Sequence, residues 1–585
     1  MKACTLDKAQ AIAARSGSMT GKSTVALCGR TLHVGFFFDG FARDLEKDRA
    51  KNRISNIGRL FLAHPRPESD DTFNAYRKAY FSGLGADYNA DGSTIANGAA
   101  RTASASLGDL PKDLVTDEAI EGAKDTLDGR NWWERLGRDL DELVDKPQKG
   151  LKVLKGAAIG SALEGWAPLR DGSITGTLMK TGADTRLEGA LARFRKDLNE
   201  VKSASDIPLR WIRVSVFGFD FGATLARAFL HALLEEDTPG AELQLVFAGL
   251  FDGVDRSAAS NPILEHFLPF RNDLDDGGLV PKEVQTVLHL IAAHERRFYR
   301  RARLLGRLQR DWREQLMPGV SEDIGGGLAP GEQKPSAELA LASLHRMYRA
   351  ACQAGVPFPL LEQLFEVDVV TAELFVFNDR VHDRSAATLA ERYLRSSGHA
   401  RPGREGFTAH MRLYIRWLAG LWRDYQTSLR TLDEEEDRLH ATRFSGGGIS
   451  GLLGIPHESD TQRKQRLQRT RAIDEERTVL QQHHGWLEEV DAEARSLRNR
   501  HQIYGLRTAG GSLEHFQMQQ TLLAEWFATQ PARLDPAVRA LFACFMHDKL
   551  VLSTAQRTAR SLSGENFFAI RGFDLPDSDD DASAA

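Results

Sequence analysis

Two glycines near the middle of the chain enclose a residue that is placed to act as a nucleophile. The pentapeptide Gly-Phe-Asp-Phe-Gly at 218–222 directly follows the apolar run 211–217 and precedes a helical stretch. Gly218 and Gly222 permit the tight, strained turn that exposes a nucleophilic side chain between a strand and a helix. The exposed position is normally a serine, but here it is Asp220.

Asp220 restricts the chemistry that this turn can support. Attack of a carboxylate on an ester carbonyl would give a mixed anhydride, which lies uphill from the ester. Attack on a saturated carbon would give an ordinary ester that water, activated by a histidine, can cleave. In a purely structural role, Asp220 would accept backbone N–H bonds at the helix N-terminus, an interaction worth about 0.5–2 kcal/mol. Its charge would then fill the oxyanion hole.

Buried strands that alternate with helical stretches must position this turn. This alternation is typical of an α/β fold with a mostly parallel sheet flanked by helices, and the turn with two glycines around a nucleophile position is of the kind found in α/β hydrolases. We expect the α/β-hydrolase-like domain to cover residues 31–85 and 186–404. The expected strands are 32–38, 211–217, 284–291 and 375–377, together with a strand-and-turn unit at 243–255.

The rest of the chain has a different composition. Apolar residues step by three and four from Tyr414 to Leu432 and from Leu487 to Leu497, which predicts two antiparallel helical arms. The glycine-rich, apolar tip between them is interpreted as a flexible hairpin or as a contact with a membrane or partner. The other expected parts are an N-terminal extension (1–30), a mostly helical insertion or lid (86–185), the arms (405–510) with their tip (445–456), a C-terminal segment (511–575) and a disordered acidic tail (576–585).

Composition and charge exclude several classes of protein. The 76 basic and 81 acidic residues nearly cancel and form no long basic run, so a nucleic-acid partner is not expected. The four cysteines lie far apart without metal-ligand spacing, so we expect neither a metal nor a disulfide framework, nor any other cofactor. Neither a signal peptide nor an apolar stretch of spanning length is found. We therefore expect cytoplasmic synthesis, with export only through a dedicated machine.

Four sequence motifs follow one another along the chain. They are Gly-Phe-Phe-Phe-Asp-Gly at 35–40 with Ile54–Ile57, Phe-Gly-Phe-Asp-Phe-Gly-Ala at 217–223 with Ala226-Arg227, Gly-Leu-Phe-Asp-Gly-Val at 249–254, and Pro-Gly-Val-Ser-Glu-Asp-Ile-Gly-Gly-Gly at 318–327. In residues and in order they resemble the motifs of the type VI secretion phospholipase effectors. Weaker echoes of the same family occur at 287–297, 347–358 and 546–548. The resemblance spans about 31–575 and implies an α/β-hydrolase fold with a serine, aspartate and histidine triad in that chain order.

The resemblance places the family's catalytic positions on three residues of this chain. The serine falls on Asp220, the aspartate on Asp252 and the histidine on Ser321, so that only the aspartate is retained. The chain also has Phe221 where the family tends to have arginine, and Phe41 where it tends to have threonine. The elbow and oxyanion residues implied are Gly218, Phe221, Gly222 and Gly40.

A relocated base would have to come from another histidine. His382, in Asn-Asp-Arg-Val-His-Asp at 378–383, follows an expected strand and is the best-placed candidate. His289 is expected on a strand and His294 at the start of a helix, while His547 lies beyond the arms. The acidic residues Glu322, Asp323 and Asp252 are an alternative divalent-cation site.

Two hypotheses follow from these substitutions. In the first, the protein is a pseudo-hydrolase that acts by binding a phospholipid or membrane surface, a type VI secretion spike component, or an immunity or partner protein. In the second, it is an active phospholipase or lipid esterase effector with a relocated site that uses Asp220 and another histidine. Deleting either member of a serine–histidine unit abolishes its catalysis, and here both are replaced, which favours the first hypothesis.

Overall fold

The computed structural model describes ten stretches of the chain. They are residues 29–41, 43–84, 173–255, 279–296, 300–306, 308–442, 459–506, 512–529, 532–548 and 566–574. The expected N-terminal extension, most of the insertion 86–185, the tip 445–456 and the acidic tail therefore lie outside the described residues.

The chain divides into two compact units. The first comprises Met1–His410, Pro536–Glu565 and Ile570–Ala585, and the second comprises Met411–Asp535 and Asn566–Ala569. The first unit therefore takes up residues that follow the long helices in the sequence.

A six-stranded, fully parallel sheet forms the centre of the first unit, as the strand–helix alternation predicts. Its strand order is β2-β1-β3-β4-β6-β8. The strands are β1 (Arg30–Phe38), β2 (Asn74–Phe81), β3 (Leu209–Phe219), β4 (Glu242–Phe251), β6 (Thr286–Ala292) and β8 (Trp312–Met317).

Helices cover both faces of the sheet, and the phenylalanines of β1 show how the two cores form. Phe36 points to one face and contacts Phe229 of α11, with ring centroids 4.4 Å apart. Phe37 points to the other face and stacks on Phe217, with ring centroids 5.0 Å apart. Helices α10 (Ser173–Ser203) and α11 (Phe221–Leu234) pack on the Phe36 face, and α3 (Asn56–Ala63) and α14 (Leu339–Gln353) on the Phe37 face.

The strand order reverses between β1 and β3. The chain runs from β1 to β2 on one side and then returns to β3 on the other side of β1. In open parallel sheets, ligands bind outside the carboxyl ends of the strands at this switch point. Asp39 and Gly40 follow β1 and Asp220 follows β3, so the switch point coincides with the expected elbow.

A small second sheet ties the C-terminal segment to the same unit. It consists of β5 (Val254–Asp255), β7 (Arg301–Arg303) and β9 (Phe573–Asp574). β9 pairs with β7 in parallel, and Arg301 forms a salt bridge to Asp574 at 2.6 Å. Residues near the C-terminus thereby lie beside the loops that follow β4.

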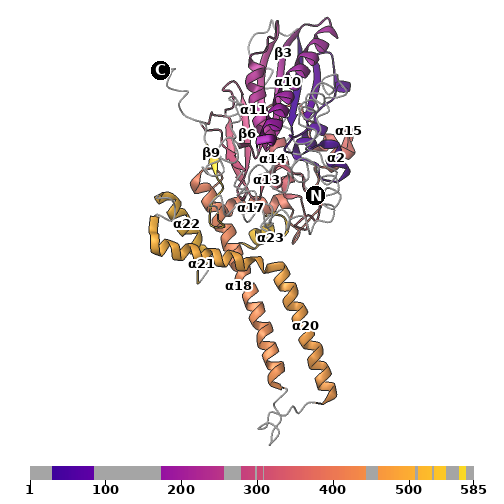
Figure 1. Ribbon diagram of the computed structural model, residues 1–585. Coiled ribbons are helices and arrows are strands. Elements are labelled where there is room, and N and C mark those ends of the chain that lie inside the picture. The colour runs from indigo at the N-terminus through magenta and orange to yellow at the C-terminus, as the bar shows by residue number, and fades with distance from the viewer. Residues whose placement is uncertain are drawn as a thin grey trace, which may run out of the picture. The chain divides into compact units, whose positions relative to one another are not determined.

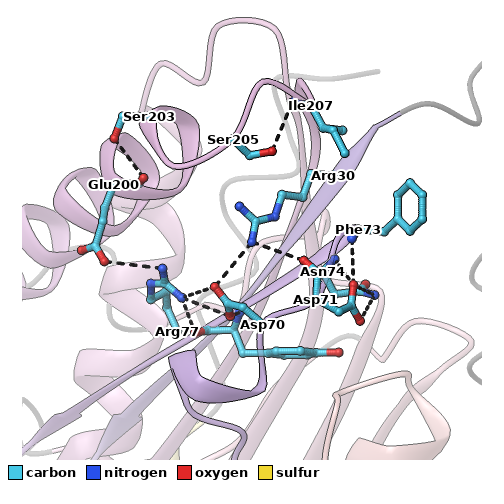
Figure 2. Close-up of polar contacts among 11 residues, drawn as sticks. Arg30, Asp70, Asp71, Phe73, Asn74, Arg77, Glu200, Ser203, Ser205 and Ile207 are labelled. Atoms are coloured by element: carbon cyan, nitrogen blue, oxygen red, sulfur yellow. Dashed lines mark hydrogen bonds and ion pairs between the residues drawn. The ribbon is translucent and has the colours of Figure 1, made fainter.

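Figure 2 shows a charged cluster near the amino ends of β1 and β2. Arg77 donates to Asp70 at 3.0 Å and lies 3.5 Å from Glu200 of α10, while Arg30 lies 3.5 Å from Asp70. Both arginines are buried. The cluster fixes the edge strand β2 to α10, at the opposite end of the strands from the elbow.

Shorter helices complete the first unit, and two local expectations there are wrong. The expected strand Phe375–Phe377 is a turn and coil after α16, and Phe375 packs its ring on Tyr348 of α14. His294 lies in a bend after β6 instead of at the start of a helix. The remaining elements are α2 (Leu45–Ala50), η1 (Pro67–Ser69), α13 (Ser321–Gly325), α15 (Leu361–Val367), α16 (Val369–Glu373), α17 (Ala386–Ser397) and α23 (Pro536–Cys544).

The second unit is helical, with two long antiparallel helices. α18 (Arg404–Thr442), whose first turns belong to the first unit, and α20 (Asp460–His484) run side by side (Figure 1), joined by ion pairs such as Arg469–Glu435 at 2.7 Å. The apolar stripe from Leu487 to Leu497 is not on the returning arm, as expected, but on the next helix, α21 (Trp486–Tyr504). α22 (Leu513–Trp526) packs against α21.

Within the described parts of the chain, every helix is too short or too polar to span a membrane.

Candidate active site

The turn between β3 and α11 has the strained geometry of a nucleophile elbow. Asp220 has φ 54° and ψ −123°, a conformation that residues other than glycine rarely adopt. A Cβ atom on Gly222 would lie 2.4 Å from the Phe38 carbonyl oxygen, and one on Gly218 would lie 2.5 Å from Ala223 Cα. Both glycines are therefore required, because the turn packs directly on β1 and on its own helix.

The Asp220 side chain does not cap α11, which was the structural alternative to a role in chemistry. It makes no hydrogen bond to the helix N-terminus, and Oδ2 instead accepts from the backbone N–H of Phe41 at 3.4 Å. In α/β hydrolases a backbone N–H from a loop beside the nucleophile is one of the two oxyanion-hole donors. The negative charge of Asp220 lies beside a loop N–H of this kind, that of Phe41.

A buried arginine lies on the other side of the elbow. Arg300 Nη2 is 3.7 Å from Asp220 Oδ2, and its Nη1 is 3.8 Å from Glu322. Arg300 and Asp220 are 8% and 1% exposed at their side chains, so little water screens their attraction. Arg300 thus holds two acidic side chains next to the elbow.

Asp252 follows β4 and is held by an arginine from the C-terminal segment. Arg571 Nη1 donates to Asp252 Oδ1, and Nη2 donates to Oδ2 at 3.1 Å, in a bidentate ion pair. The backbone N–H of Ala292 also donates to Oδ1, at 2.9 Å. In a serine hydrolase the triad carboxylate orients a histidine, whereas the Asp252 carboxylate binds the guanidinium of Arg571.

The position of Arg571 follows from the small sheet. Arg571 lies two residues before β9, and its Nε donates to the carbonyl oxygen of Arg300 at 2.9 Å. Arg300 in turn directly precedes β7. The pairing of β7 with β9 therefore connects the arginine beside Asp220 to the arginine that binds Asp252.

Ser321 begins α13, which packs directly on the elbow. A Cβ atom on Gly325 would lie 2.1 Å from the Phe219 ring. The Ser321 N–H donates to Glu295 Oε2 at 3.1 Å, and Ser321 Oγ is buried without a hydrogen-bond partner among the described residues. A hydroxyl at this position cannot act as the imidazole base that the family has there.

A histidine and an aspartate form a buried pair next to Ser321. His547 Nδ1 lies 2.7 Å from Asp323 Oδ1, and the His547 backbone N–H donates to Asp323 Oδ2 at 3.0 Å. Burial alone would lower the pKa of His547, but the Asp323 charge and hydrogen bond outweigh it and raise that pKa. His547 Nε2 has no hydrogen-bond partner within the described chain.

The other histidine candidates lie in different settings. His382 is exposed in the turn between Val381 and Arg384, whereas Asp220 is buried. His289 lies on β6 as expected, where its Nε2 accepts from Gly253 N–H at 3.0 Å and its Nδ1 lies 3.0 Å from Glu314. His547 is buried, as Asp220 is, whereas His382 is exposed, so His547 is the better candidate for a relocated base.

The acidic residues proposed as a cation site are each matched to a different basic group. Asp252 binds Arg571, Asp323 binds His547, and Glu322 faces Arg300. Across the described stretches, no group of three or more acidic, histidine or cysteine side chains is arranged to hold a metal ion.

Sequence reasoning missed Arg300 and Arg571. Arg571 is 319 residues from Asp252 along the chain, and neither arginine lies in a motif that indicates a partner. A retained aspartate without its histidine was the one available signal, since a buried carboxylate needs a substitute cation.

Comparison with known proteins supports the fold alone. The chain matches no protein-family model and no curated protein sequence. It is similar to the crystal structure of an uncharacterized protein from Pseudomonas aeruginosa, with 17% identity and a TM-score of 0.50 over 97% of this chain and 82% of that chain. A more distant similarity, with 16% identity and a TM-score of 0.28 over 54% of this chain and 57% of the other, is to the Tle1 effector bound to the VgrG spike from the Type 6 secretion system.

Proposed function

We propose that this protein is a pseudo-hydrolase related to the type VI secretion phospholipase effectors, which acts through binding and not through ester hydrolysis. The observation that carries this proposal is the bidentate ion pair between Asp252 and Arg571. The acid of the triad is engaged by a guanidinium, so it cannot orient a histidine base. The serine–histidine–aspartate triad then lacks its nucleophile and its base, and its retained acid is bound to another group.

The electrostatics of the elbow support the same proposal. Ester hydrolysis needs donors that stabilise a negative charge developing on the substrate oxygen. The Asp220 carboxylate accepts from Phe41 N–H and lies beside Arg300, so this positive potential is already neutralised. An oxyanion next to Asp220 would meet a like charge in a water-poor site.

The proposed partners follow from the resemblance in the sequence. They are a phospholipid or membrane surface, a type VI secretion spike component, or an immunity or partner protein. The protein would be made in the cytoplasm and delivered into another cell by the secretion machine.

A second candidate function is an active lipid hydrolase with a relocated site. The observation that favours it is the buried Asp323–His547 pair, whose Nε2 has no partner among the residues described. In this scheme Asp220 attacks a saturated carbon of the substrate, the C–O bond to the leaving group breaks, and His547 takes a proton from the water that cleaves the resulting ester.

Incubation of the purified protein with mixed phospholipids separates the two candidates. The pseudo-hydrolase gives no fatty acid, lysolipid or headgroup release above that of the Asp220→Asn variant. Release that disappears in both Asp220→Asn and His547→Gln, with unchanged thermal unfolding, would instead establish the relocated site. Vesicle sedimentation of the same variants measures lipid binding without turnover.

A further inference from the structure

A cavity of about 470 Å³ lies at the edge of the six-stranded sheet, away from the elbow. Its walls are the edge strand β8 and the helix α14, of which Figure 1 labels the helix. The lining residues of β8 are 312–315, the amino-terminal part of a strand whose carboxyl end leads to Ser321. The volume is within the range of small-molecule sites.

Four arginines line this cavity. Arg346 and Arg349 are three residues apart on α14 and share a face of the helix, Arg313 comes from β8, and Arg401 lies just before α18. Among the residues with described positions, no carboxylate forms an ion pair with Arg313, Arg346 or Arg401. The cavity therefore concentrates positive charge.

The acidic residue in the lining does not compensate for this charge. Glu314 is 5% exposed at its side chain, lies 3.0 Å from His289 Nδ1 and accepts from Leu305 N–H at 2.7 Å. Its carboxylate is thus directed to the other side of the strand. Arg346 instead donates to the neutral Gln315 Oε1 at 3.2 Å, and burial lowers the pKa of Arg346.

The floor of the cavity is apolar. Leu288, Trp312 and Ala350 are buried residues that line it, and Leu308 adds an exposed apolar side chain at the rim. Guanidinium groups match the oxygen geometry of phosphate in a planar, bidentate way, and apolar walls bury hydrocarbon. The ligand that fits is an anion with an apolar part.

We propose that the groove between α14 and β8 binds a phosphate group that carries an apolar substituent, as in an anionic phospholipid or a soluble phosphate ester. A neighbouring cavity of about 380 Å³ shares Gln315 and Arg346 and adds Glu391, Leu394 and Arg395 of α17. Its one carboxylate, Glu391, pairs with Arg395 at 3.8 Å, so Arg346 remains the charged group that the two cavities share. This site does not depend on the elbow, so it stands whether or not the elbow hydrolyses lipid.

Calorimetric titration of the full chain with dihexanoyl phosphatidic acid tests the site. The double variant Arg346→Gln/Arg349→Gln is expected to bind at least about tenfold more weakly, because charge-assisted hydrogen bonds are lost. The matched control is Arg463→Gln/Arg471→Gln on α20, which removes two exposed charges and should bind like the wild type. Thermal unfolding and circular dichroism check that each variant is folded.

Further arms of the experiment distinguish the source of the phosphate. Inorganic phosphate should compete with the ester for the site. Ala350→Leu should weaken the binding of the ester more than the binding of phosphate, because the leucine side chain fills the apolar floor. Sedimentation with phosphatidylcholine vesicles, with and without phosphatidic acid, shows whether the ligand is a membrane lipid or a soluble ester. Absence of binding to both ester and phosphate, or equal affinity of the wild type and the folded double variant, would overturn the proposal.

Discussion

Asp252 and Arg571 form a bidentate ion pair in which neither side chain is more than 1% exposed. Removing one partner leaves a buried charge without compensation, so Arg571→Ala should lower the free energy of unfolding by about 3–5 kcal/mol. Urea unfolding monitored by circular dichroism measures this loss. The exposed control Arg395→Ala, which breaks an ion pair with Glu391, should change stability by less than about 1 kcal/mol.

The effects of substituting Asp252 and Arg571 on the free energy of unfolding should not be additive. The double variant Asp252→Leu/Arg571→Leu should be more stable than Arg571→Ala alone, because no charge is left buried. If Arg571→Ala and Arg395→Ala lose the same free energy, the ion pair does not stabilise the first unit.

Restoring the triad should require the release of Asp252. We expect Asp220→Ser/Ser321→His to remain inactive on phospholipids, because Arg571 still engages the acid. The triple variant that adds Arg571→Leu frees Asp252 to orient the new histidine, and it should release fatty acid above background. Activity of the double variant would show that Arg571 does not block the acid.

Gly222→Ala should destabilise the protein by about 1–3 kcal/mol or more, because its Cβ would lie 2.4 Å from the Phe38 carbonyl oxygen. Gly420→Ala on α18 is the matched control, since a Cβ there has nothing within 4 Å. That change should stabilise the helix by up to about 1 kcal/mol. Thermal melts of the two variants should therefore shift in opposite directions.

The free energy of unfolding should fall as the pH is lowered, because two buried histidines lie beside Tyr393. The Tyr393 hydroxyl lies 2.6 Å from His410 Nδ1 and 3.2 Å from His294 Nε2. Burial lowers the pKa of His410 to about 4 and that of His294 well below its ordinary value. Between about pH 6.5 and 4 the unfolded chain binds more protons than the folded chain, so acid favours unfolding.

The measurement is the urea midpoint across this pH range. His410 contributes up to about 1.4 kcal/mol for each pH unit below its ordinary pKa. His410→Gln lacks this group and should show a shallower fall than the wild type. Parallel profiles for the two proteins would contradict a neutral, buried His410. Burial raises the pKa of Asp39 to about 6, so protonation of this residue favours the folded state as the pH falls. This contribution is the same in the wild type and in His410→Gln, and it cancels when the two stability profiles are subtracted.

Much of the fold was predictable because it is encoded locally. The run 211–217 and the glycines 218 and 222 predict a strand, a turn and a helix, and β3, Asp220 and α11 follow in that order. The expected strand Phe375–Phe377 was wrong because a short apolar run fits a strand or a coil equally well, and here tertiary packing on Tyr348 decides.

The partners in the site were less predictable, because they depend on contacts between distant segments. The substitutions Asp220 and Ser321 are visible in the sequence, but the sequence does not show which groups compensate the acids. Arg571 reaches Asp252 only through the pairing of β7 with β9, a two-residue ladder with no periodicity of its own. The helix-capping alternative for Asp220 was wrong for a similar reason. Its carboxylate binds the N–H of Phe41, which is 179 residues away in the sequence.

The pairing of β9 with β7 also sets an order for folding during synthesis. The ribosome makes Asp252 and the whole central sheet long before it makes Arg571, and the second unit is synthesised in between. Until then the nascent sheet holds an acid without its counter-ion, so the sheet is less stable while the helices of the second unit emerge. A chain truncated before residue 570 would keep this deficit, and a larger unfolded fraction would be open to chaperones and proteases.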